Sequence, residues 1–264
     1  MTPPELAERL RAAEAVARDA GQLALRYLAN PAALVVKLKG PQDVLTAADG
    51  AVERLIVSVL RAAFPDDAYL GEEGSGVGGA ADGGPCWVID PIDGTANFAR
   101  AVPYWCVSIA LVAAGRTELG VIYDPSADLL YTAMSGAGAW RNGERLHVSA
   151  TADIKRATVD IGYSSRTPVE PFGRLVNALL HRGINVTQCN SAALSLARVA
   201  DGRLDGYAER HLYAWDVLAG LLLVEEAGGR VNAFLTGDAM VAGNDTLAAT
   251  PALYAVLVEA LAGG

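Results

Sequence analysis

Apolar residues at helical spacing open the chain and return in its second segment. Between residues 2 and 28 they recur every three or four positions, which predicts a first amphipathic helix. Residues 37–49 are polar and predict a loop that closes at Asp49, the candidate N-cap of a second helix. That second helix carries one apolar stripe and should end at Phe64.

From residue 68 onward, short apolar segments bounded by glycine or turn residues replace the helical pattern. Residues 75–84 are rich in Gly and Ala and predict a mobile surface loop, and Asn142-Gly143 predicts a hairpin turn. The expected strands are 69–70, 86–89, 106–112, 118–123, 129–133, 158–161 and 204–208, of which 106–133 should form an antiparallel meander. The expected later helices are 172–181, 191–199, 215–227 and 252–261.

This mixture of strands and helices predicts an α/β fold of the α+β type. Its 264 residues are enough for one catalytic unit with a sizeable core. No linker or repeat divides the chain, so we expect residues 1–264 to form a single unit of two closely packed halves. A metal-binding half would cover about residues 1–150, and a substrate-side half residues 151–264.

Composition narrows the classes of partner. The chain is 52% hydrophobic, yet it has no apolar run of the ~18 to 20 residues that a membrane span needs, so no membrane partner is expected. A net charge of −9 without a basic stripe argues against a nucleic-acid partner. Three unrelated cysteines suit a reducing compartment, and charged residues at 5, 8 and 9 interrupt any signal peptide. We therefore expect a cytoplasmic protein.

The candidate chemistry is concentrated in WVIDPIDGTANF, residues 87–98. Pro91 prevents a flat strand, so the carboxylates of Asp90 and Asp93 can turn toward one place, where the carbonyl of Ile92 can join them. Hard oxygen donors of this kind suit Mg²⁺ or Mn²⁺. The competing interpretation is that the two aspartates only cap a turn and the next helix. Glu72, which arrives from a neighbouring strand end, favours the metal site.

Gly94 and Thr95 follow directly and predict a short helix whose free N–H groups would hold an anion beside the metal. Clustered Mg²⁺ ions with a phosphate point to phosphoryl transfer by an activated water, without a protein nucleophile. A haloacid-dehalogenase-type phosphatase would need two aspartates two residues apart, and that spacing is missing here. The three histidines are scattered, so a nucleophilic hydrolase is disfavoured as well.

Several long motifs resemble the inositol monophosphatase family from the first helix to the last. They are GEEG (71–74), WVIDPIDGTANF (87–98), GAGAWRNGERLHVS (136–149) and WDVLAGLLLVEEAGG (215–229). The resemblance implies a layered αβαβα sandwich of the inositol monophosphatase and fructose-1,6-bisphosphatase kind. It also implies a lithium-sensitive phosphomonoesterase, commonly a homodimer, that uses two or three Mg²⁺ ions with Mn²⁺ as a substitute.

The resemblance assigns roles to individual residues. It implies that the metal ligands are Glu72, Asp90, the carbonyl of Ile92, Asp93 and Asp216. Thr95, together with Glu72, would orient the attacking water, and Asp49 would pair with Thr95. From the residues alone, Asp216 is an acid in the first turn of a helix and Asp49 a helix cap.

The substrate side rests on fewer residues. Asp93, Gly94 and Thr95 would contact the phosphate, while Ser191, Ala192 and Glu209 match positions that touch the alcohol portion of the substrate. The competing interpretation of Glu209 is that of a solvated acid beside Arg210. Asn190 and Tyr213 depart from a glycine and a histidine that are common in the family, which puts inositol itself in question.

The resulting hypothesis is hydrolysis of inositol 1-phosphate or a similar polyol phosphate. Histidinol phosphate, fructose 1,6-bisphosphate and adenosine 3′,5′-bisphosphate are alternative substrates. An alternative from another functional class is a regulatory binding protein on the same fold.

Overall fold

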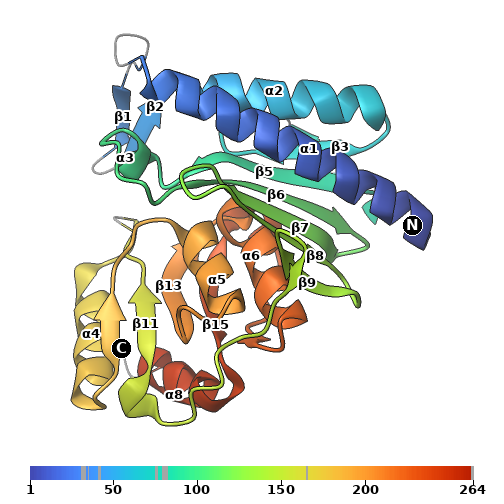
Figure 1. The fold of residues 1–264 in the computed structure, drawn as a ribbon. Coiled ribbons are helices and arrows are strands. Elements are labelled where there is room, and N and C mark those ends of the chain that lie inside the picture. Colours follow the sequence, from blue (N-terminus) through green and yellow to red (C-terminus); the bar gives the residue numbers. More distant parts are fainter. Residues whose placement is uncertain are drawn as a thin grey trace.

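The computed structural model describes residues 1–30, 34, 36–40, 43–74, 77–78, 83–164 and 166–262, with the backbone alone at 37–40, 43–44 and 77–78. Six helices build its layers: α1 (Pro3–Leu28), α2 (Ala47–Ala63), α4 (Val169–His181), α5 (Ala192–Ala200), α6 (Ala214–Glu226) and α8 (Pro251–Ala262). In Figure 1, α1 and α2 cover one face of a large sheet, and α5 and α6 separate that sheet from a smaller one. Helices α4 and α8 cover the far face of the smaller sheet. The layered αβαβα fold class is therefore confirmed.

The large sheet has eight strands in the order β10-β9-β8-β7-β6-β5-β3-β4. They are β3 (Ala68–Gly71), β4 (Val77–Gly78), β5 (Cys86–Asp93), β6 (Cys106–Ala113), β7 (Arg116–Asp124), β8 (Leu129–Met134), β9 (Gly138–Arg141) and β10 (Glu144–Arg145). Strands β6 to β8 form the expected antiparallel meander, β5, β9 and β10 extend it, and β3 pairs with β5 in parallel. Asn142 and Gly143 have φ values of 47° and 84°, the left-handed pair that a tight hairpin turn requires.

The smaller sheet has five strands in the order β12-β11-β13-β15-β14. They are β11 (Thr158–Ile161), β12 (Asn185–Thr187), β13 (Gly206–Leu212), β14 (Arg230–Val231) and β15 (Asn244–Ala249). The sequence predicts β11, and its expected strand 204–208 overlaps the start of β13. It misses β12, β14 and β15, of which β15 lies between β13 and β14. Residues 246–249 of β15 are all buried, so the strand lacks the apolar and polar alternation that marks a strand with one solvated face.

The predicted polar loop at 37–49 is wrong, because β1 (Val36–Gly40) and β2 (Asp43–Thr46) form an antiparallel hairpin there. Asp49 is not the N-cap of α2. The cap is Thr46, and the carboxylate of Asp49 accepts hydrogen bonds from the Thr46 backbone N–H at 2.8 Å and hydroxyl at 2.6 Å. This reciprocal capping box starts the helix at Ala47. The predicted loop at 75–84 falls largely outside the described residues.

Packing between the layers holds α6 close to the large sheet. A Cβ atom at Gly120 on β7 would lie 2.8 Å from the Cα of Ala219 on α6, so only glycine permits this approach. The close contact fixes the start of α6, which carries Asp216. Among the described residues, no helix is both long and apolar enough to cross a bilayer.

Candidate active site

Three carboxylates converge where β5 ends and α6 begins. Candidate ligand oxygens of Asp90, Asp93 and Asp216 all lie within 4.8 Å of one another. The register of β5 against β6 shifts between Asp90 and Asp93, so two residues of β5 oppose a single residue of β6. Such a bulge lets both carboxylates reach one place. Asp216 is the third residue of α6, and its carboxylate accepts the Tyr213 backbone N–H at 2.8 Å.

The mutual repulsion of these buried carboxylates favours binding of a cation. Burial raises the pKa of Asp90 and of Asp216 well above the usual range, and the negative charge of Glu72 is the next largest cause for both. A divalent cation among these groups would relieve both the repulsion and the loss of solvent. Every donor in the cluster is a carboxylate oxygen, which fits Mg²⁺.

Asp93 is held in place by neighbours on two other elements. Its Oδ2 atom accepts hydrogen bonds from the Ser191 hydroxyl and from the Ala193 backbone N–H, the latter at 2.9 Å. The thiol of Cys106 on β6 also points to this oxygen, at 3.7 Å. Ser191, which the sequence places at the substrate, thus donates to a predicted metal ligand.

Thr95 joins the short helix α3 (Thr95–Phe98) to the start of α2. Its hydroxyl lies 3.1 Å from Asp49 Oδ1 and 2.9 Å from the carbonyl oxygen of Ile92. Burial raises the pKa of Asp49 to about 6, against the lowering effect of the hydrogen bonds from Thr46. The contact between Asp49 and Thr95 is the one that the family resemblance implies. The single hydroxyl proton of Thr95 can be donated to Asp49 or to the Ile92 carbonyl, not to both at once.

Gly94 makes the turn between β5 and α3. Its φ is 89°, in the left-handed region, and a Cβ there would lie 3.1 Å from both the Ser191 side chain and the Tyr104 carbonyl oxygen. A larger residue would therefore strain the backbone and displace the neighbours that hold Asp93.

Glu53 was not predicted as part of the site. This carboxylate is fully buried beneath the strand end that carries Glu72, and it accepts the Glu73 backbone N–H at 2.8 Å. A Cβ at Gly71 would lie 2.4 Å from Glu53 Oε2, which explains the glycine. In the sequence, the feature that could have indicated a buried role for Glu53 is its place as a charged residue within the apolar stripe of α2.

One cavity of about 570 Å³ connects these groups. Its acidic end contains Glu72, Asp93 and Asp216, with Gly94 and Thr95 beside them. Its lining also contains Asp160, Tyr163, Arg166, Ser191, Ala192, Tyr207 and Glu209. With this size and polar lining, the cavity suits a small polar molecule rather than an apolar one.

Glu209 lies deeper than predicted. It belongs to β13, its residue is 7% exposed, and the Tyr207 hydroxyl donates to its Oε2 at 2.5 Å. The interpretation as a solvated acid beside Arg210 is wrong, because Arg210 turns away to Asp245 and to the carbonyl oxygen of Leu261. Burial raises the pKa of Glu209 to about 7.

Comparison with known proteins identifies the same family that the sequence motifs resemble. The sequence profile of the inositol monophosphatase family matches residues 5–262. "Nus factor SuhB" of Xylella fastidiosa is 42% identical over 225 residues, covering 84% of this chain and 81% of that protein. The crystal structure of extragenic suppressor protein suhB from Bartonella henselae is 33% identical with a TM-score of 0.90, covering 97% of this chain and 99% of that one. Inositol monophosphatase from Anabaena is 35% identical with a TM-score of 0.83, covering 98% and 97%.

Proposed function

The chain belongs to the inositol monophosphatase family, and from this premise we propose that it is a Mg²⁺-dependent phosphatase of small phosphomonoesters. Inositol 1-phosphate or a similar polyol phosphate is the proposed substrate class. The observation that carries the proposal is the convergence of Asp90, Asp93 and Asp216 beside a polar cavity of about 570 Å³. A purely structural site has no need to bring these mutually repelling carboxylates together.

Glu72, Asp90, Asp93, Asp216 and the Ile92 carbonyl would hold two or three Mg²⁺ ions, with Mn²⁺ as a substitute. When bound, Mg²⁺ supplies positive charge to the phosphate oxygens and lowers the pKa of water. The phosphate would lie against Gly94 and Thr95, and the alcohol portion of the substrate against Ser191, Ala192 and Glu209, all of which line the cavity.

Thr95 and Asp49 would position the attacking water. When the Thr95 hydroxyl donates to Asp49 at 3.1 Å, its oxygen is left to accept a hydrogen bond from water in the cavity. Because the pKa of Asp49 is about 6, its carboxylate is mostly ionised at neutral pH and keeps the hydroxyl proton directed away from the cavity. Glu72 lines the same cavity as Thr95 and would accept a proton from the same water.

Thr95→Val should lower kcat by roughly a hundredfold, the scale expected when a reacting group, here the attacking water, is misplaced. The valine methyl group keeps the volume but cannot donate to Asp49. Phosphate release at saturating Mg²⁺ measures the effect. Thr117→Val on β7 is the matched control, since Thr117 does not line the cavity and should leave kcat unchanged. Equal kcat in both variants would contradict the role of the hydroxyl.

Glu209→Gln should raise the KM for a polyol phosphate several-fold and flatten its pH dependence. In the unaltered chain, Glu209 ionises as the pH rises through about 7 and becomes a stronger acceptor for substrate hydroxyls, so KM should fall across that range. The comparison is made with 4-nitrophenyl phosphate, which has no hydroxyl for Glu209 to bind. A KM change of the same size for both substrates would contradict a contact with the alcohol portion.

Phosphate release from a panel of phosphomonoesters, with Mg²⁺ and with a chelator, tests the proposed function. The panel contains inositol 1-phosphate, histidinol phosphate, fructose 1,6-bisphosphate and adenosine 3′,5′-bisphosphate, and Li⁺ is added as an inhibitor. We expect Mg²⁺-dependent, Li⁺-sensitive release, fastest with the polyol phosphate. A chain that releases no phosphate from any of them is not the proposed enzyme.

A second candidate function is that of a regulatory binding protein, which the name of the Xylella relative, Nus factor, favours. Binding of a partner would then survive variants that lose hydrolysis.

In either case we propose a homodimer, as is common in the family. Light scattering should give twice the mass of one chain.

A further inference from the structure

The last turn of α5 is tied to the large sheet by an ionic network. Arg198 on α5 contacts Asp124 at the end of β7, with Nη2 to Oδ2 at 3.0 Å, and its Nη1 donates to the hydroxyl oxygen of Tyr131 on β8 at 2.7 Å. Asp201, which follows α5, accepts the Tyr131 hydroxyl proton at 3.0 Å. Arg141 on β9 reaches the same carboxylate at 3.3 Å. These five residues are called the α5 network below.

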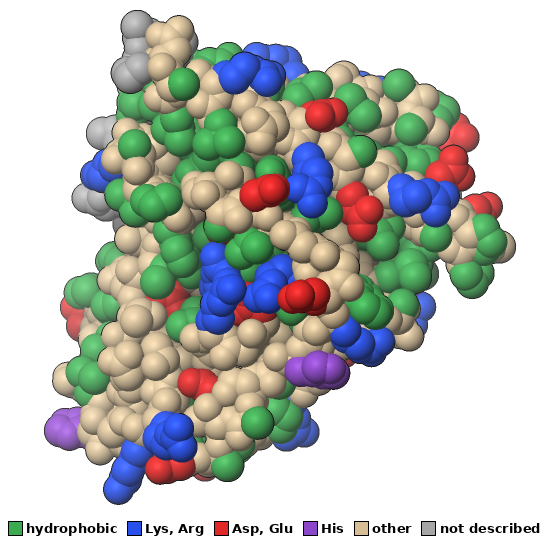
Figure 2. Space-filling view, viewed as in Figure 1, with side chains coloured by type: hydrophobic (Ala, Val, Ile, Leu, Met, Phe, Trp, Pro, Cys, Tyr) green, Lys and Arg blue, Asp and Glu red, His purple; other side chains and the backbone are tan. Residues whose placement is uncertain are grey.

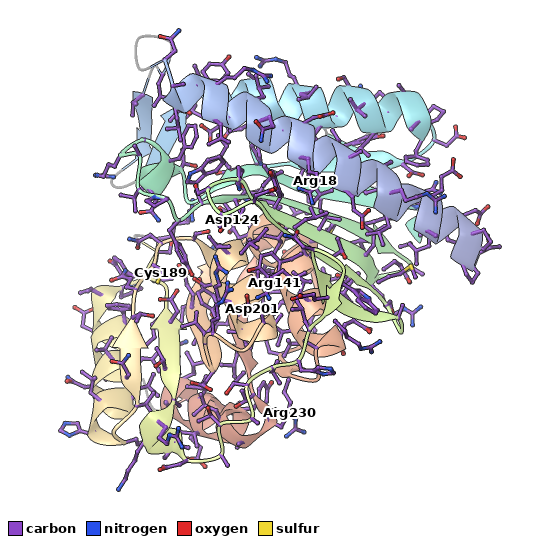
Figure 3. All side chains as sticks on the ribbon, in the orientation of Figure 1. Arg18, Asp124, Arg141, Cys189, Asp201 and Arg230 are labelled. Atoms are coloured by element: carbon purple, nitrogen blue, oxygen red, sulfur yellow. The ribbon has the colours of Figure 1, made fainter. Side chains whose placement is uncertain are left out.

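The α5 network is shielded from solvent. Arg198 has a side-chain exposure of 14%, Asp124 of 2% and Asp201 of 0%. Figure 3 labels Asp124, Arg141 and Asp201, which lie where the large sheet meets α5. In Figure 2, basic and acidic side chains meet in the middle of the same face. Salt screens partly buried pairs less than exposed ones, so this contact should hold at ordinary ionic strength.

The other end of α5 holds Asp93. The Ser191 hydroxyl and the Ala193 backbone N–H donate to Asp93 Oδ2 at the first turn of the helix. Between the two ends, the Ser195 hydroxyl donates to Asp160 in the cavity wall at 2.7 Å. A helix of nine residues is about 13 Å long, and a rigid secondary element of this kind can carry coupling between its two ends. A shift at its last turn therefore reaches the donors at its first.

We propose that Arg198 is a positioning residue for Asp93. It locks α5 to strands β7 and β8 of the large sheet, and Asp93 is carried by β5 of that same sheet. The Ser191 and Ala193 donors are thereby fixed in position relative to the Asp93 carboxylate that they orient. The inference rests on the proposed function, because it takes Asp93 to be a metal ligand.

The test is Mn²⁺ binding, measured by electron paramagnetic resonance on the full chain well below each variant's thermal midpoint. Arg198→Met alone would leave Asp124 buried without its cation, so the main variant is Arg198→Met with Asp124→Asn. Its Mn²⁺ dissociation constant should rise about tenfold, as is typical when a group that orients a metal ligand is lost. The half-saturating Mg²⁺ concentration for phosphate release should rise in parallel.

Arg141→Met is the matched control. It removes a cation from the same network, but Arg141 lies on β9 rather than α5, and Asp201 keeps Arg198 and Arg203 as partners. Its Mn²⁺ dissociation constant should stay within about twofold of the unaltered chain, below the effect expected for a lost orienting group. Arg198→Lys, which keeps the charge but loses the planar fork, should give an intermediate constant.

Equal Mn²⁺ affinity in the unaltered chain, the double variant and Arg198→Lys would overturn the inference, even if thermal midpoints fall. Equal weakening in the double variant and in Arg141→Met would also overturn it, because the effect would then belong to the network as a whole. If the unaltered chain neither binds Mn²⁺ nor releases phosphate, the proposed function fails, and the role of Arg198 fails with it.

Discussion

Asp93→Asn is expected to lower Mg²⁺-dependent phosphate release by roughly a thousandfold, since metal ligation is worth several kcal/mol in the transition state. The amide has nearly the same shape and can still accept hydrogen bonds from Ser191 and Ala193. It lacks the negative charge that the proposed metal site requires. The fold should therefore persist while turnover is lost, which circular dichroism and a phosphate assay on the same sample can establish.

The matched control for this variant is Asp19→Asn. Asp19 is an exposed residue of α1, so the same chemical change there should leave the rate unaltered. Full activity of Asp93→Asn at ordinary Mg²⁺ concentrations would remove Asp93 from the site. Lost activity with a collapsed fold would leave the ligand role to be tested by Asp90→Asn and Asp216→Asn.

The stabilising effect of Mg²⁺ should grow as the pH rises from 5 to 8. Burial raises the pKa of Asp49 to about 6 and that of Glu209 to about 7, so the metal-free folded chain holds more protons than the unfolded chain at mildly acid pH. Its stability must then fall as the pH rises from the unfolded-chain pKa values of 3.8 and 4.5 to those folded values, by about 3 kcal/mol in total for each group. Asp90 and Asp216, whose pKa values are also raised, add to the same trend. Because these two are proposed Mg²⁺ ligands and Asp49 and Glu209 are not, it is the titration of the ligands that makes the effect of Mg²⁺ depend on pH.

Bound Mg²⁺ reverses this trend at its ligands, because it binds their deprotonated forms. The thermal midpoint with Mg²⁺ minus that with chelator should consequently widen toward pH 8. Asp90→Asn sharpens the measurement, since it should raise the midpoint of the metal-free chain by relieving repulsion and should shrink the gain from Mg²⁺. A gap that stays constant with pH would show that these carboxylates do not bind the ion.

The centre of the site could be predicted from the sequence because its residues are near one another along the chain. Asp90, Asp93, Gly94 and Thr95 fall within six positions, and their order already implies a bent strand end followed by a helix start. Asp216 and Asp49 needed the family resemblance, since each looks like an ordinary acid at a helix start. The five layers followed from the same resemblance, and the apolar periodicity supplied most of the helices.

What the sequence analysis missed depends on contacts between distant residues. The buried carboxylate of Glu53 meets the strand end at Gly71, and Arg198 meets Asp124, across separations that no local pattern encodes. Strand β15 is buried on its last four residues and so has no alternation to detect. The hairpin of β1 and β2 was hidden because its polar residues are as typical of loops as of exposed strands.

The capping box of α2 has a consequence for how the molecule could lose activity. A single carboxylate, that of Asp49, closes the first turn of this helix at Thr46 and also holds the hydroxyl of Thr95. Fraying of that one turn would release Thr95 while the rest of the fold stays intact. Local opening is easier than global unfolding, so amide hydrogen exchange near residues 47–50 should report inactivation at temperatures where the chain is still folded.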